Sequence, residues 1–222
     1  MVAVQLLGVS KMKIGVIGAS GRLGKKVVLR ALDSGYDVKG FYHHHIYSIP
    51  HVEIIQKDLF QLEKKDIEDI DVLISTYGSG FNCDPKINYE AYLKYQELLN
   101  NSHKKLIVVA GAGCLFTDST HQKYEYESEN HPLKLKQISY HNLLGIRSLS
   151  NAKFDWCVVS PARIFDFEGP FTNNYKVGYD EEILYNDSNK SYLTYEDLAQ
   201  AIIDLINHNQ FLRKNLTFVS NV

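Results

Sequence analysis

The segment Met12–Gly24 constrains the fold of this chain more than any other stretch. A short apolar run leads into three glycines at Gly-x-x-Gly-x-x-Gly spacing, Gly18, Gly21 and Gly24, and a helical pattern follows through Leu32. In a strand–turn–helix unit the first glycine permits a tight turn, the second lets the backbone approach a pyrophosphate, and the third lets the helix pack closely on the sheet. Free N–H groups and the positive end of the helix dipole then face the phosphates. This context predicts a dinucleotide site, with a merely tight strand–helix turn as the alternative.

Apolar runs alternate with helical patterns along the chain, at the rhythm of βαβ units. We expect strands at 13–17, 38–42, 52–55, 72–76, 106–110, 155–159 and 216–219, and helices at 25–34, 87–101, 137–149 and from Tyr195. Such alternation implies a parallel sheet that is covered on both faces. The predicted fold class is α/β, a Rossmann-type doubly wound parallel sheet in one domain, residues 12–222. Residues 1–11 precede a second start-like Met12 and are expected to be an N-terminal extension.

Two local signals mark helix ends in this pattern. Gly35 follows Ser34, which is typical of a helix that ends in a glycine. Thr194 precedes the last helix, and Asp197 stands three residues further on, which is a variant of the capping box.

Two segments break the alternation of strands and helices. Residues 114–133 are polar and rich in tyrosine and histidine, and residues 163–193 hold Gly, Asn and Asp between short aromatic patches. Both leave from the carboxyl ends of predicted strands, where doubly wound folds bind their ligands. We expect these substrate-side segments to form the walls or lid of a substrate site, with mobile surface loops as the alternative.

The composition of the chain argues against nucleic acid and membrane as binding partners. The net charge of −2 gives no basic footprint for nucleic acid, and no apolar stretch reaches the roughly 18–20 residues that span a bilayer. No signal peptide is visible, and the three cysteines, Cys83, Cys114 and Cys157, have no paired or metal-type spacing. We therefore expect a cytoplasmic protein, monomer or homodimer, whose partner is a small molecule rather than nucleic acid or membrane.

Several segments together resemble the atypical short-chain dehydrogenase/reductase superfamily, in particular its compact NAD(P)H-binding members called NADH-flavin reductases, NmrA-like proteins or biliverdin reductase B-like proteins. The resemblance runs from Met12 to about Val219. Besides the glycine loop it rests on Gln56–Phe60, Asp71–Gly78, Leu106–Gly113, Phe154–Ala162 and Ser191–Ala199.

The resemblance implies which residues hold the cofactor. They border the adenine after strand three, line the path to the nicotinamide ribose after strand four, and enclose the nicotinamide after strands five and six. With the glycine loop, the predicted cofactor-binding set is Gly18, Ser20, Gly21, Arg22, Leu23, Gly24, His43, Asp58, Leu59, Thr76, Tyr77, Gly78, Gly111, Ala112, Gly113, Ser160, Pro161 and Ala162. For the glycines at 111 and 113, a close strand–loop turn is the alternative.

The end of strand two bears on the choice of cofactor. It reads Phe41–His45 with no carboxylate, where an NAD-binding fold usually has an acidic residue for the ribose 2′-hydroxyl. Arg22 is placed to pair with a 2′-phosphate, as in similar NADP-binding relatives, although His43 stands where those relatives often carry arginine. We predict NADP(H) in preference to NAD(H). The histidine run is interpreted as the rim of the cofactor site rather than a metal site, and no metal is expected.

The chain lacks the Tyr-x-x-x-Lys pair of the best-known short-chain dehydrogenases, because no tyrosine has a lysine four residues later. Hydride transfer to a conjugated acceptor asks less of the protein, since the cofactor supplies the chemistry. Similar flavin and biliverdin reductases carry a serine after strand five and a histidine after strand six, where this chain reads Ala112–Cys114 and Pro161–Arg163. Neither polar group is retained.

The catalytic residues are not assigned by the sequence. The candidates are Tyr77, Tyr140, His141 and Arg163. Arg163 either holds an anionic substrate group or lies on the surface, and Cys114 is expected to be a packing residue rather than a nucleophile.

The leading hypothesis is an NAD(P)H-dependent oxidoreductase that passes hydride to a flavin, quinone-like or other conjugated acceptor, with FMN or FAD as possible substrates. The first alternative is a non-catalytic NmrA-like sensor of dinucleotide redox state. The second is an isomerase acting on a nucleotide sugar, which the missing tyrosine–lysine pair disfavours.

Overall fold

The central element of the fold is an eight-stranded sheet in the order β3-β2-β1-β4-β5-β6-β10-β8. The computed structural model describes residues 11–43, 48–80, 82–129 and 131–221. All neighbouring strands pair in parallel except β8, which runs antiparallel to β10. The predicted doubly wound α/β fold is therefore confirmed. The strands are β1 (Lys13–Ile17), β2 (Asp37–Tyr42), β3 (Glu53–Gln56), β4 (Val72–Ser75), β5 (Lys105–Val109), β6 (Asp155–Pro161), β8 (Tyr175–Gly178) and β10 (Asn215–Ser220).

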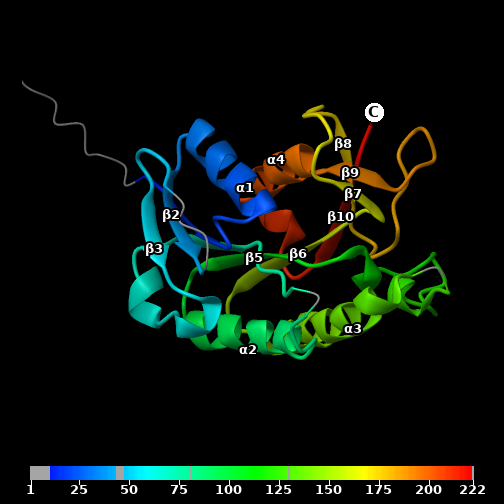
Figure 1. The fold of residues 1–222 in the computed structure, drawn as a ribbon, viewed down its shortest axis with the longest axis horizontal. Coiled ribbons are helices and arrows are strands. Elements are labelled where there is room, and N and C mark those ends of the chain that lie inside the picture. The colour runs from blue at the N-terminus through cyan, green and yellow to red at the C-terminus, as the bar shows by residue number, and fades with distance from the viewer. Residues whose placement is uncertain (1–10, 44–47, 81, 130, 222) are drawn as a thin grey trace, which may run out of the picture.

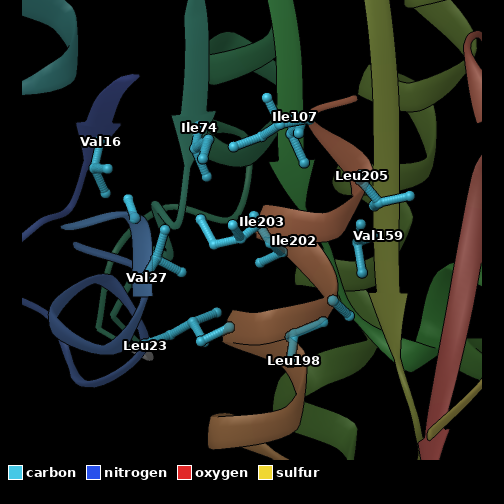
Figure 2. Packing of buried hydrophobic residues seen from close by; sticks show 14 of the residues in the cluster. Val16, Leu23, Val27, Ile74, Ile107, Val159, Leu198, Ile202, Ile203 and Leu205 are labelled. Atoms are coloured by element: carbon cyan, nitrogen blue, oxygen red, sulfur yellow. The ribbon is translucent and has the colours of Figure 1, made fainter. Parts of the chain in front are cut away.

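Helices cover both faces of this sheet (Figure 1). Helices α1 (Arg22–Asp33) and α4 (Tyr195–Leu205) lie together on one face, and α2 (Ile87–Leu99) and α3 (Leu133–Ser148) on the other. Each face has its own apolar cluster because successive side chains of a strand point to opposite sides. In β1, Val16 packs towards α1 and α4, whereas Ile17 packs towards α2 and α3. Figure 2 shows α4 packed on the sheet through Leu198, Ile202 and Leu205.

The last helix begins where the sequence predicted, but only one of the two hydrogen bonds of the expected capping box is present. The Thr194 hydroxyl accepts a hydrogen bond from the Asp197 N–H at 3.0 Å. The Asp197 carboxylate does not reciprocate; it accepts from the backbone N–H groups of Thr172 and Asn173 at 2.8 and 3.0 Å. Since Asp197 is fully buried, these bonds fasten the segment 163–193 to the start of α4. The predicted end of the first helix is confirmed by Gly35, which has a φ of +87°.

The segment 163–193 is more regular than predicted. It contains β7 (Ile164–Asp166) and β9 (Tyr192–Thr194), which form a two-stranded parallel sheet, and β8 at the edge of the main sheet. Strands of three or four residues are too short for alternation to reveal them. Smaller differences concern helix limits, because α3 begins at Leu133 rather than 137 and α2 ends at Leu99 rather than 101. Of the predicted N-terminal extension, residues 1–10 lie outside the described residues, as do His44 and His45 of the histidine run.

A cluster of charges joins neighbouring strands near their amino ends. The Asp69 carboxylate accepts from Lys13 Nζ at 2.5 Å and from Lys39 Nζ at 2.6 Å. Lys13 and then Lys39 lower the pKa of Asp69 to about 2. This cluster lies at the edge of the sheet opposite the carboxyl ends of the strands, where the candidate site is found.

Candidate functional site

The glycine loop turns sharply at the end of β1. Gly18 has a φ of +78°, a conformation that side chains disfavour, and its N–H and that of Ala19 both donate to the Phe41 carbonyl at 3.0 Å. The Thr76 hydroxyl donates to the Ile17 carbonyl at 3.0 Å, so the ends of β1, β2 and β4 are held together. A Cβ at position 18 would lie 2.9 Å from the Thr76 oxygen. The first glycine therefore has the turning role that the sequence predicted.

The third glycine has a different neighbour from the one expected. A Cβ on Gly24 would lie 2.0 Å from the Gly18 carbonyl oxygen and 3.0 Å from the Ala19 Cα. The first turn of α1 therefore packs on the backbone of its own loop, and this contact, rather than the sheet, excludes a side chain. At Gly21 an added Cβ would meet only the Gly18 carbonyl oxygen, at 3.1 Å. The second glycine consequently leaves its other sides open to a ligand.

The start of α1 offers backbone donors to an anion. Within the described residues, no protein acceptor pairs with the N–H groups of Ser20, Arg22 or Leu23. The helix is capped by Gly21 without a side-chain hydrogen bond, and no acidic residue lies in its first turn. Unpaired N–H groups and the helix dipole make such a terminus a site for phosphate. These features fit the pyrophosphate of a dinucleotide.

The residues predicted to select NADP(H) have distinct surroundings. His43 follows β2, and its Nδ1 lies 3.3 Å from Asp58 Oδ2. Arg22 instead places its guanidinium carbon 4.7 Å from the centre of the Phe167 ring, and Phe167 follows β7. To reach a 2′-phosphate beside His43, the Arg22 side chain would have to leave that ring. Asp58 also accepts from the Phe60 N–H at 2.9 Å, which fixes its carboxylate after β3.

A cavity of about 650 Å³ opens at the carboxyl ends of β4, β5 and β6. It brings together eight of the predicted site residues: Tyr77, Gly78, Gly111, Ala112, Gly113, Pro161, Ala162 and Arg163. Added Cβ atoms at Gly78 and Gly111 would meet nothing within 4 Å, so the backbone is open to a ligand there. Segments 114–133 and 163–193 supply further walls, including Glu125, His131 and Phe165. Residues of both substrate-side segments thus line this cavity, and their role as walls of a substrate site stays a prediction.

Three predicted residues direct their side chains elsewhere. Ser160 is fully buried, its hydroxyl donates to Asn215 Oδ1 at 2.8 Å, and the residue does not line the cavity. Tyr140 and His141, which the sequence offered as candidate proton donors, do not line this cavity. On α3 the residues that face the cavity are Leu135, Ile138, Ser139 and Asn142, as helical periodicity requires. Tyr140 packs instead near Tyr126, at 6.1 Å between ring centres, and His141 Nδ1 lies 2.8 Å from the Gln137 carbonyl.

Arg163 lies at the cavity wall, already paired. Its Nη2 donates to Glu125 Oε2 at 2.6 Å, and its Nη1 donates to the Tyr185 hydroxyl at 2.7 Å. The Glu125 side chain is only 9% exposed, and this pairing raises the pKa of Arg163. Because a carboxylate offsets the guanidinium charge, the wall presents a donor and an acceptor side by side rather than a free positive charge. Glu125 was not identified from the sequence.

A serine and a histidine in the cavity also escaped the sequence analysis. Ser139 Oγ lies 3.3 Å from His131 Nε2, and a Cβ on Gly113 would lie 2.2 Å from that hydroxyl oxygen. The glycine after β5 therefore makes room for a side chain of α3. No local pattern announces the pair, since its members come together only when α3 packs beside β5.

The remaining candidates differ in their acidity. Burial, followed by the charge of Asp58, raises the pKa of Tyr77 to about 12, so its hydroxyl stays protonated and can donate a hydrogen bond. Burial raises the pKa of the Cys114 thiol to about 12 as well. Cys114 is fully buried, which confirms it as a packing residue, and Cys157 is likewise buried in β6.

In the described part of the chain, no group of three or more His, Cys, Asp or Glu residues is arranged to hold a metal ion. Across the same residues no helix is long and apolar enough to cross a membrane.

Known proteins share this architecture over nearly the whole chain. YwnB, an uncharacterized protein of Bacillus subtilis, is 29% identical over 212 residues, which cover 94% of this chain and 99% of YwnB. The structure of "a putative NADH-flavin reductase" from Streptococcus pneumoniae matches with a TM-score of 0.87 and 26% identity, over 95% of this chain and 100% of that chain. The oxidoreductase ylbE from Lactococcus lactis has a TM-score of 0.76 at 18% identity, over 95% and 91% of the two chains, and shows the fold alone.

A family model supplies the more decisive comparison. The model that describes NAD(P)H-binding proteins matches residues 18–209, from the first glycine of the loop to beyond α4. The matched range contains the unpaired N–H groups at the start of α1, the cavity and both substrate-side segments. The chain therefore belongs to the NAD(P)H-binding family.

Proposed function

We propose that this protein is an NAD(P)H-dependent oxidoreductase that passes hydride to a flavin, quinone-like or other conjugated acceptor. The observation that carries the proposal is the cavity beside Gly111–Gly113 and Pro161–Ala162, the two stretches expected to enclose a nicotinamide. A cavity of about 650 Å³ is within the usual range for small-molecule sites. The likeness to the Streptococcus pneumoniae structure supports the same class of reaction.

The chain's own residues would bind, orient and shield the reactants in this reaction. The N–H groups at the start of α1 would hold the pyrophosphate, and Thr76 would fix the loop that carries them. A bound nicotinamide would supply the hydride. Apolar lining from Leu135, Ile138 and Phe165 would exclude water from the acceptor, and the Glu125–Arg163 pair would orient its polar edge.

We further propose a preference for NADP(H) over NAD(H). In support, the end of β2 carries His43 and no carboxylate, although Asp58 lies beside it. Paired titrations with NADPH and NADH, followed by nicotinamide fluorescence, test the preference. Tighter binding of NADH would refute it.

The rival function is a non-catalytic sensor of dinucleotide redox state. It is favoured by one observation: the serine and the histidine that similar reductases carry after strands five and six are not retained here, where the chain reads Ala112–Cys114 and Pro161–Arg163. NADPH oxidation with FMN, FAD, menadione and biliverdin separates the two functions. Turnover on any of these acceptors supports the reductase, and micromolar binding without turnover supports the sensor.

The setting in which we expect this activity is cytoplasmic, with a small-molecule acceptor as partner and no nucleic acid or membrane surface involved. A monomer or a homodimer would suffice, since the described cavity is lined by residues of one chain. Sedimentation at several protein concentrations tests the assembly state.

A further inference from the structure

Ser139 and His131 form a polar pair on the cavity wall (Figure 1 shows α3 along the lower face of the sheet). Ser139 Oγ and His131 Nε2 are 3.3 Å apart, and Ser139 is only 6% exposed. The backbone N–H of His131 donates to the Ser128 carbonyl at 3.1 Å, directly before Pro132 caps α3. The backbone of His131 is therefore fixed at the start of α3, and Ser139 is carried by the helix itself.

The pair lies against the backbone that is expected to support the nicotinamide. A Cβ on Gly113 would lie 2.2 Å from Ser139 Oγ and 3.1 Å from His131 Cε1. Gly113 follows β5, and it lines the same cavity as Pro161 and Ala162 at the end of β6. A hydroxyl in this place faces the position where an acceptor would meet the cofactor.

We propose that Ser139 and His131 deliver the proton that a carbonyl acceptor takes up when it is reduced in this cavity. The inference rests on the proposed function. As hydride reaches the acceptor, the Ser139 O–H bond breaks and its proton goes to the acceptor oxygen. The serine oxygen takes a proton from the His131 imidazolium, and the imidazole regains one from water. One hydride from NAD(P)H and one proton from water are then consumed per acceptor reduced.

Burial and the neighbouring charges determine the pKa of His131, and with it the pH range in which the imidazolium can supply a proton. Burial lowers the pKa of His131, the charge of Glu125 opposes that change, and Lys136 on α3 adds to it. Arg163, which follows β6, and Tyr77, which follows β4, also line the cavity. The Arg163 guanidinium already forms an ion pair with the Glu125 carboxylate. The imidazolium is consequently a stronger acid than free histidine, and its population falls as pH rises through its lowered pKa.

A hydrolytic serine–histidine–acid arrangement fits this geometry less well. The Glu125 carboxylate is directed to Arg163 at 2.6 Å, and the described residues include no ion pair between Glu125 and His131. Without an acid on its other nitrogen, the imidazole lacks the group that orients a general base in such triads. Proton donation during reduction needs only the hydroxyl and the imidazolium.

Two acceptors separate proton delivery from other roles of the pair. Reduction of menadione to its neutral hydroquinone consumes one proton in addition to hydride, whereas the methylene blue cation becomes its neutral reduced form with hydride alone. In single turnovers, Ser139→Ala and His131→Gln should slow menadione reduction by roughly 100-fold, the scale of general acid catalysis, and leave methylene blue reduction unchanged. The wild-type menadione rate should fall as pH rises through the His131 pKa, and His131→Gln should abolish that dependence.

Matched variants control for loss of fold and of cavity shape. Ser148→Ala removes a hydroxyl of α3 outside the cavity, and His141→Gln removes a histidine of α3 outside the cavity. Both should keep wild-type rates with both acceptors, and all four variants should bind NADPH as wild type does. In the cofactor-free protein, an NMR titration of the His131 Cε1 proton should give a midpoint below the ordinary histidine range.

The possible failures point to different errors. Equal losses with menadione and methylene blue, unchanged menadione rates in Ser139→Ala, or a His131 midpoint at or above the ordinary range would overturn proton delivery while the proposed function stands. Failure of the wild type to oxidise NADPH with menadione, methylene blue, FMN, FAD or biliverdin would overturn the proposed function itself.

Discussion

Gly21→Val tests whether backbone approach at the second glycine of the loop carries cofactor binding. Gly21 has φ −71° and ψ 167°, an extended conformation that any residue adopts. A Cβ there would meet only the Gly18 carbonyl oxygen, at 3.1 Å, which a shift of a few tenths of an ångström relieves. We therefore expect a loss of folding stability of no more than about 1 kcal/mol. The branched methyls of valine, however, would occupy the space that phosphates need, and dinucleotide affinity should fall at least roughly tenfold, or ~1.4 kcal/mol.

Gly24→Ala is the matched comparison, because its added Cβ would approach the same Gly18 carbonyl oxygen more closely. That atom would lie 2.0 Å from the Gly18 carbonyl oxygen and 2.8 Å from the carbonyl carbon, so the helix and the loop must separate. Overpacking of this kind costs roughly 1–3 kcal/mol. Thermal unfolding of the cofactor-free protein and NADPH titration by fluorescence measure the two effects. Unaltered NADPH binding in Gly21→Val, or a larger loss of stability there than in Gly24→Ala, would refute the reasoning.

Three further outcomes can be checked on the same protein. Arg22→Ala should weaken NADPH more than NADH in paired titrations if the guanidinium leaves its aromatic neighbour for the 2′-phosphate; equal losses would remove that role. Lys13 and Lys39 hold the pKa of Asp69 near 2, below the ordinary 3.8, so the stabilisation is present above about pH 4 and is lost as pH falls towards 2. Asp69→Asn should flatten that part of the stability curve by less than about 1 kcal/mol, since the carboxylate is half-exposed; acid unfolding identical to wild type would contradict this. Gly113→Ala should destabilise the protein by roughly 1–3 kcal/mol, because its Cβ falls 2.2 Å from the α3 serine hydroxyl, and an unchanged melting temperature would count against it.

The parts of the fold that the sequence predicted correctly are those with a local physical signal. A conformation is indicated within a few residues by the three glycines before a helix, by the continuous apolar strands and by Thr194 ahead of α4. The short strands β7 and β9 carry no such signal, since three residues hold too little alternation to be read. They pair with each other across nearly thirty residues, and between them the buried Asp197 accepts hydrogen bonds from the backbone of Thr172 and Asn173.

In the candidate site, too, the positions with a local signal could be predicted and those that depend on packing could not. Backbone positions at strand ends, such as Gly111 and Pro161, follow from the order of strands and could be predicted. Side chains that meet across the cavity could not, because Ser139 and His131 are brought to Gly113 by the packing of α3. Tyr140 had the more familiar chemistry but lies on the wrong side of that helix. Residue type alone did not determine which face of α3 the cavity would use.

The most direct test of the central claim is a single-turnover measurement with NADPH that carries deuterium at one or the other position of nicotinamide C4, in the presence of menadione. If the nicotinamide binds with one face towards the cavity, NADPH oxidation should be saturable in menadione. It should also be slowed by deuterium at one of the two positions only. Micromolar NADPH binding with no oxidation by menadione, FMN, FAD or biliverdin would contradict the account and leave dinucleotide sensing as the function of this fold.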